Sequence, residues 1–257
     1  MNEFLIGLQF LTRISVTNQC EWTEENFGKS VKYFPLIGAV VGTISAALTG
    51  FFFFVTGGKL PIFTGALAFV LPIILTGGIH CDGFMDSVDG LFSGREREKI
   101  LEIMKDSRVG AFGAVSLVLI SALEISALIE LFKLSIIFTL ASIFAAPIIS
   151  RLMMVMTIGI FPYARPQGMG KAFAMYTTRR TIFFAAVSTL LLLLPLILFD
   201  VKIFCTAILA LTISFCFTLY FGKFATKKIG GVTGDIYGAV STLVELIVPI
   251  IFLLSLI

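Results

Sequence analysis

Long apolar segments separated by short polar stretches run along the whole chain. A helix that crosses a bilayer needs roughly 20 mainly apolar residues. The segments that approach this length cover residues 34–56, 60–76, 110–132, 134–160, 181–199, 203–221 and 238–257. The pattern therefore predicts an all-α fold, a polytopic integral membrane bundle of about seven helices (six to eight). We expect residues 1–257 to form a single domain.

The composition supports a membrane protein. Hydrophobic residues make up 58% of the chain and charged residues only 14%, whereas a soluble domain is about a quarter charged. The net charge of +3 is small. We therefore expect the lipid bilayer, and no nucleic acid, among the partners.

Basic residues alternate between the two sides of the predicted helices. One set of connections holds most of them: Arg13, Lys29, Lys32, Arg95, Arg97, Lys99, Lys105, Arg108, Arg165, Lys171, Arg179, Arg180, Lys223, Lys227 and Lys228. The other connections hold Lys59, Lys133 and Lys202. By the positive-inside rule, the N-terminal segment 1–33 and the loops 77–110, 161–181 and 222–237 are cytoplasmic. We expect a multi-pass protein of the cell inner (plasma) membrane.

The run from Phe4 to Arg13 is too short to span a bilayer. Its apolar positions 4, 5, 8 and 11 have helical spacing. Two interpretations remain open: a helix that lies on the cytoplasmic leaflet, or a helix that packs on the bundle.

An acidic motif follows the second apolar segment. Asp82, Asp86 and Asp89 are spaced four and three residues apart, which places them on one face of a helix. Three adjacent carboxylates repel one another, and hard divalent ions such as Mg²⁺ bind carboxylates and substrate phosphates. We predict that they are metal ligands, and that His80 binds metal, contacts phosphate or orients an aspartate. The alternative is a solvated helix start whose acids favour the helix dipole.

Basic residues downstream of this motif are candidates for binding phosphate. Lys105 and Arg108 flank Asp106 in the same predicted loop as the three aspartates, and Arg108 can contact phosphate through two N–H groups. Arg165 and Lys171 lie in the next polar loop and could hold a phosphate or serve only as positive-inside anchors.

Three further positions complete the candidate set. Arg151 lies inside an apolar run, where an ionisable residue is a functional candidate; it could pair with an aspartate of the motif or line a substrate cavity. Gly234 and Asp235 belong to a glycine-rich turn that could present backbone N–H groups to an anion, although Asp235 could equally be an ordinary first-turn residue of a helix. Glu245, in the last apolar segment, could be a buried hydrogen-bonded acid.

Several ordered motifs resemble those of the cobalamin synthase (adenosylcobinamide-GDP ribazoletransferase) family. They are Phe10–Ile14, Tyr33–Gly38, the Gly-Gly-Ile-His-Cys-Asp-Gly run through Gly90, Met104–Gly113 and Gly231–Gly238. The spaced HxDGxxDxxDG core with a downstream KDSRxGxFG is specific, and the resemblance covers nearly the full chain.

The resemblance implies a Mg²⁺-dependent membrane transferase of vitamin B12 biosynthesis. Such an enzyme joins adenosylcobinamide-GDP to α-ribazole, or to its 5′-phosphate, and releases GMP. On this reading a ribose 5′-hydroxyl attacks the diphosphate, Asp82, Asp86 and Asp89 hold Mg²⁺, and Asp89 or Asp106 accepts the proton. His80 belongs to the same catalytic set. A homo-oligomer, or association with other cobalamin-assembly enzymes, is left open.

Two other classes of protein share some of these features. A CDP-alcohol phosphotransferase also uses spaced aspartates, but its motif expects an Ala-Arg pair soon after the DG, and here Met85 and Asp86 follow Phe84. A cation-coupled transporter would place acids near the middle of the membrane, whereas these acids lie at loop ends.

Overall fold

The computed structural model describes residues 2–16 and 22–257. These residues form helices and connecting loops, with no strand among them. The elements are α1 (Asn2–Leu11), α2 (Glu24–Lys29), η1 (Ser30–Tyr33), α3 (Phe34–Val55), α4 (Pro61–Thr76), α5 (Ile79–Leu91), α6 (Arg97–Ile103), α7 (Ala111–Leu134), α8 (Ile136–Ile160), α9 (Met169–Tyr176), α10 (Arg179–Leu193), η2 (Leu194–Leu198), α11 (Val201–Ile229) and α12 (Gly234–Leu254).

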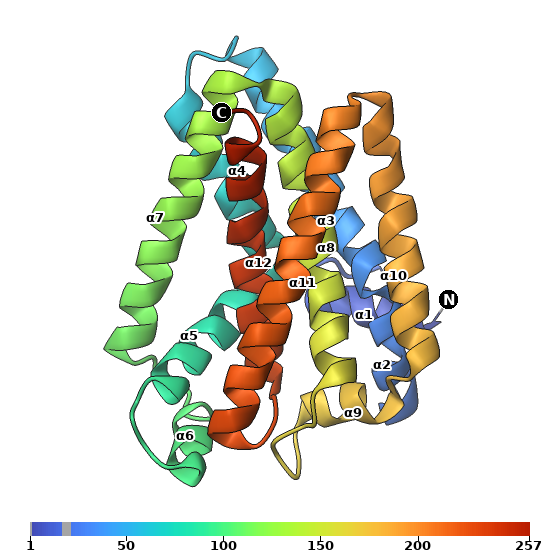
Figure 1. The fold of residues 1–257 in the computed structure, drawn as a ribbon, viewed down its shortest axis with the longest axis vertical. Coiled ribbons are helices and arrows are strands. Elements are labelled where there is room, and N and C mark those ends of the chain that lie inside the picture. Colours follow the sequence, from blue (N-terminus) through green and yellow to red (C-terminus); the bar gives the residue numbers. More distant parts are fainter. Residues whose placement is uncertain (1, 17–21) are drawn as a thin grey trace.

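Membrane-spanning helices are confirmed, and their number agrees with the expected range. Six helices are long and apolar enough to cross a bilayer, and α4 with α5 can make a seventh as a bent pair. The long helices run alternately up and down. Figure 1 shows α5, α6 and α9 at one end of the bundle and the C-terminus at the other.

The innermost helix is α8, which is buried along nearly its whole length. It packs closely on α3 because α3 presents glycines to it. A Cβ added at Gly38 would lie 2.3 Å from the carbonyl oxygen of Pro147, and one added at Gly42 would lie 2.4 Å from that of Phe144. Close backbone approach through small residues is typical of helix contacts in membranes.

The N-terminal helix α1 packs on the bundle, which was the second of the two interpretations of the run from Phe4 to Arg13. Ile6 and Leu11 are almost completely buried, and the aromatic ring of Phe10 makes edge contacts with Phe27 and Phe173. Residues 1 and 17–21 of the predicted segment 1–33 lie outside the described residues.

A sharp turn joins α4 to α5 and aims α5 across the bundle. The two helices meet at 92°, and the turn consists of Gly77 and Gly78 with φ of 64° and 75°. This left-handed conformation is accessible to glycine at little cost. The backbone N–H of Arg13 donates to the carbonyl oxygen of Leu75 (2.7 Å) and ties the end of the N-terminal segment to this turn.

Candidate active site

The acidic motif lies on α5, which crosses the first turn of α12. A Cβ added at Gly83 would lie 2.9 Å from the backbone oxygen of Asp235, so the two backbones nearly touch. This contact brings together carboxylates from two helices. Asp86 is half-buried and interacts electrostatically with Asp82, Asp89 and Asp235.

Asp235 lies between the acidic residues of α5 and the basic loop that carries Arg165. Its Oδ2 accepts a hydrogen bond from Arg165 Nη2 at 2.8 Å, and both side chains are mostly buried. The hydroxyl of Thr233, which caps the N-terminus of α12, lies 3.2 Å from the same oxygen. Arg165 also interacts electrostatically with Asp86. One guanidinium therefore offsets the negative charge of more than one carboxylate.

Backbone pairing places Arg165 in this position. The N–H of Ala164 donates to the oxygen of Val232, and the N–H of Val232 donates to the oxygen of Pro162, both at 2.8 Å. The loop after α8 is thereby fixed to the loop before α12. Burial raises the pKa of the Tyr163 phenol in this loop, so the phenol stays neutral and keeps its O–H at neutral pH.

Asp89 has a different set of contacts from Asp82 and Asp86. Its carboxylate accepts the backbone N–H groups of Gly110 (2.9 Å) and Gly113 (2.8 Å) at the N-terminus of α7. A Cβ at either glycine would lie within 2.6 Å of that carboxylate. Asp89 therefore anchors the segment 104–113 to α5, and this explains physically why the two motifs occur together.

Asp106 and Arg108 pair with each other at the surface. Arg108 donates from Nη2 to Asp106 Oδ2 at 2.7 Å and from Nε to Oδ1 at 3.1 Å. The Arg108 side chain and backbone N–H hold the pKa of Asp106 at about 2. Lys105 is exposed beside them.

The other predicted phosphate-binding residues lie at the same end of the bundle. The Lys171 ammonium donates to the carbonyl oxygen of Pro166 (2.6 Å) at the surface. Gly234 begins α12, and a Cβ added there would have no atom within 4 Å. A small side chain at this position would therefore fit next to Asp235.

Arg151 and His80 face the interior of the bundle. Arg151 is completely buried and pairs with Glu245 and with the hydroxyl of Ser150 (2.8 Å), so its ionic partner lies on α12 and not in the acidic motif. His80 is 5% exposed, and its Nε2 has no hydrogen-bond partner within the described residues.

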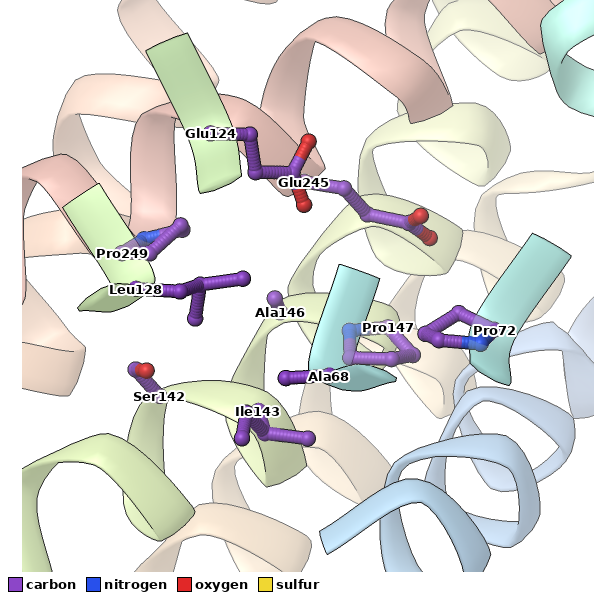
Figure 2. Close-up of a pocket in the computed structure, with 10 residues that line it drawn as sticks. All are labelled: Ala68, Pro72, Glu124, Leu128, Ser142, Ile143, Ala146, Pro147, Glu245 and Pro249. Carbon is purple, nitrogen blue, oxygen red and sulfur yellow. The ribbon is translucent and has the colours of Figure 1, made fainter. Parts of the chain in front are cut away.

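Two small cavities of about 20 Å³ each lie among the buried side chains of the bundle. Both are lined by Glu124 and Glu245, and His80 lines the second. Figure 2 shows the two glutamates of the first cavity on the same side, away from Ser142 and Ile143. A cavity of this size holds about one water.

The donors near α5 suit a hard divalent ion, but only with help from a ligand. Carboxylate oxygens are what Mg²⁺ prefers. Among the described residues, however, no three His, Cys, Asp or Glu side chains gather closely enough to hold a metal ion. Mg²⁺ is usually bound by one or two carboxylates together with substrate phosphates.

Arg13 also lies near the acidic motif, although sequence analysis proposed no role for it in the site. Together with Asp82 it lines a cavity of about 490 Å³ between α1 and the α4–α5 turn. The sequence signal was its place in the motif Phe10–Ile14, directly after a short apolar helix. Only the packing of α1 against the turn places it in the same cavity as Asp82.

Comparison with known proteins identifies the family. The profile described as Cobalamin-5-phosphate synthase matches residues 3–253. The chain is 39% identical to the adenosylcobinamide-GDP ribazoletransferase of Desulfitobacterium hafniense over 96% of this chain and 94% of that protein. It is 35% identical to the enzyme of the same name from Fusobacterium nucleatum, over 98% and 97% of the two chains. No solved structure matches. A match over nearly the whole length, with the acidic motif inside it, means that the chain belongs to the cobalamin-5-phosphate synthase family.

Proposed function

We propose that this protein joins adenosylcobinamide-GDP to α-ribazole, or to α-ribazole 5′-phosphate, and releases GMP. The relatives carry the name adenosylcobinamide-GDP ribazoletransferase, and their alignment with this chain is nearly complete. The observation that carries the proposal is the contact of α5 with α12. It gathers Asp82, Asp86 and Asp235 beside Arg165 at one end of a membrane bundle.

The chemistry requires that a hydroxyl attack a phosphorus atom surrounded by negative oxygens. Mg²⁺ is the proposed cofactor; Asp82 and Asp86 would hold it, and the ion would neutralise charge on the diphosphate and the departing GMP. Neither aspartate side chain has a hydrogen-bond or ion-pair partner within the described part of the chain, so their oxygens are available. Arg165, with a planar guanidinium, is placed to stabilise phosphate oxygens at the same cluster.

The proton of the attacking hydroxyl passes to a carboxylate on α5. Asp106 is poorly suited to accept it, because a pKa of about 2 makes the group a weak base at neutral pH. Asp89 already accepts two backbone N–H groups. The contacts of Asp89 favour a role in holding the segment 104–113 against α5, and those of Asp106 a role in shaping the turn at Arg108.

The phosphorylated acceptor limits which hydroxyl can attack. The family description names a cobalamin 5-phosphate, in which the 5′-oxygen of the ribose already carries phosphate. An esterified oxygen cannot attack, so we propose that another ribose hydroxyl attacks when the acceptor is the 5′-phosphate. Since the two products differ only by the 5′-phosphate, the same hydroxyl of α-ribazole must attack, and we propose it in place of the 5′-hydroxyl that sequence analysis predicted.

We also propose that the site faces the cytoplasm across the cell membrane. The loops that carry the site hold most of the basic residues, and the opposite connections hold Lys59, Lys133 and Lys202. The positive-inside rule and the gathering of these loops at one end of the bundle (Figure 1) both support this orientation.

The direct test is GMP release by detergent-purified protein supplied with adenosylcobinamide-GDP and α-ribazole, with Mg²⁺ and with EDTA. The proposal predicts GMP and a cobalamin product in equal amounts with Mg²⁺, and neither with EDTA. A folded protein that releases no GMP under these conditions would refute the proposal. CDP-linked lipid substrates, and then cation-coupled uptake into vesicles, would be assayed next.

A further inference from the structure

The cavity between α1 and the α4–α5 turn has the size of a ligand site. Its volume of about 490 Å³ falls in the range of roughly 300–1,000 Å³ that is usual for small-molecule pockets. Gln9, Phe10, Thr12 and Arg13 form one wall, and Thr76 to Ile79, Cys81, Asp82 and Met85 form the other. It therefore opens directly onto the first carboxylate of the acidic motif.

The wall that carries Arg13 is held in place by hydrogen bonds. The Thr12 hydroxyl donates to the oxygen of Leu8 (2.6 Å) and accepts from the N–H of Ile14 (3.1 Å), which ends α1 in a tight turn. The Arg13 N–H then bonds to Leu75. A Cβ at Gly77 would lie 2.0 Å from Arg13 Nε, so the guanidinium rests on the glycine turn.

Arg13 is exposed and has no ion-pair partner among the residues that the structure describes. The other arginines named as candidates each have an acid: Arg108 has Asp106, Arg165 has Asp235 and Arg151 has Glu245. A guanidinium that lines the same cavity as Asp82 and has no ion-pair partner is suited to bind phosphate oxygens, which it can contact through two N–H groups.

The size of the cavity limits what can bind there. A corrin macrocycle is too large for it, whereas a nucleoside that carries one or two phosphates fits. Phe10 adds an aromatic ring to the wall, and aromatic rings stack on heterocyclic bases.

We propose that this cavity binds a phosphate-bearing nucleoside, with Arg13 in contact with its phosphate. The inference rests on the proposed function and adds to it a binding residue and a location. The phosphate has two sources in that reaction: the GDP portion of the donor and the 5′-phosphate of the acceptor.

Steady-state kinetics of Arg13→Gln and Arg13→Lys test the proposal and distinguish the two sources. Loss of a charge-assisted hydrogen bond is expected to raise the KM of the bound substrate about tenfold or more, while Arg13→Lys, which keeps the charge, gives a smaller rise. A higher KM for adenosylcobinamide-GDP assigns the cavity to the GDP portion. A higher KM for α-ribazole 5′-phosphate but not for α-ribazole assigns it to the acceptor.

Lys59→Gln, which removes an exposed charge at the opposite end of the bundle, is the control and should match wild type. Unchanged KM values for both substrates in Arg13→Gln would overturn the inference.

Equilibrium binding of GMP and of α-ribazole 5′-phosphate to wild type and to Arg13→Gln provides a readout without turnover. If wild-type protein releases no GMP, the proposed function fails, and weaker binding of either probe to the variant still supports the cavity. Equal binding of both probes to wild type and to Arg13→Gln overturns it.

Discussion

The carboxylates of α5 differ in what their oxygen atoms contact. Asp82 and Asp86 face other charged groups, whereas Asp89 accepts two N–H groups from the start of α7. Sequence spacing predicted that the three aspartates share a helix face. It could not reveal the contacts of Asp89, because Gly110 and Gly113 come from a separate loop and meet Asp89 only through packing.

Asp89→Asn should therefore lower thermal stability. An asparagine keeps one acceptor oxygen and presents an NH₂ group to the second N–H, and a hydrogen bond to a charged group contributes about 1.5–3 kcal/mol. Thermal unfolding of the detergent-solubilised variant measures the effect. Asp82→Asn, which removes no such bond, is the matched control and should melt like wild type; equal melting of the two variants would contradict the anchoring role.

Asp106 should not determine the pH dependence of the reaction. Arg108 lowers the pKa of Asp106 from 3.8 to about 2, so the carboxylate is ionised above pH 4 and the favourable pairing is lost only as pH falls toward 2. Rate profiles of wild type and Asp106→Asn between pH 5 and 9 should have the same shape, even if the variant is slower. Loss of the acidic limb in the variant would instead identify Asp106 as the proton acceptor.

At the scale of elements, the site depends on the close crossing of α5 and α12. Apolar length predicted the spans well: residues 34–56 correspond to Phe34–Val55, and 134–160 to Ile136–Ile160. The prediction 203–221 was short because α11 continues to Ile229 through a polar, lysine-bearing end that a hydrophobicity criterion excludes. The 92° turn at Gly77 and Gly78 was not foreseen, since glycines permit many turns and their neighbours select one.

Gly83→Ala should separate the two helices and weaken both folding and turnover. The new Cβ would lie 2.9 Å and 3.1 Å from backbone atoms of Asp235, which cannot rotate away as a side chain can. Overpacking of this kind costs about 1–3 kcal/mol. Gly234→Ala places a methyl group where no atom lies within 4 Å, so this variant should keep wild-type thermal stability. Wild-type melting and turnover in Gly83→Ala would disprove the importance of the crossing.

At the scale of the whole molecule, charge alternation predicted that the polar loops share one end, and the bundle places them there (Figure 1). The pairing of Arg151 with Glu245 could not be predicted from the sequence, because these residues are 94 positions apart and meet only when the two helices pack in the bundle. The same holds for Arg13, which α1 carries to the α4–α5 turn.

Orientation in the membrane can be tested with single cysteines in a background that lacks the natural ones. Lys133→Cys, at the end of the bundle away from the site, should react in intact cells with a maleimide that does not cross membranes. Lys99→Cys on α6 should react only after the membrane is permeabilised. The reverse pattern would show that the site lies outside the cytoplasm.

The most direct test of the account compares GMP release from adenosylcobinamide-GDP and α-ribazole by wild type, Asp86→Asn and Asp200→Asn. Asp200 caps the far end of α11, where its Oδ1 accepts the N–H of Lys202 at 2.8 Å. We predict that Asp86→Asn loses about a hundredfold or more in rate while remaining folded, and that Asp200→Asn turns over like wild type. An Asp86→Asn enzyme with a near-normal rate would contradict the central claim that chemistry occurs where α5 crosses α12.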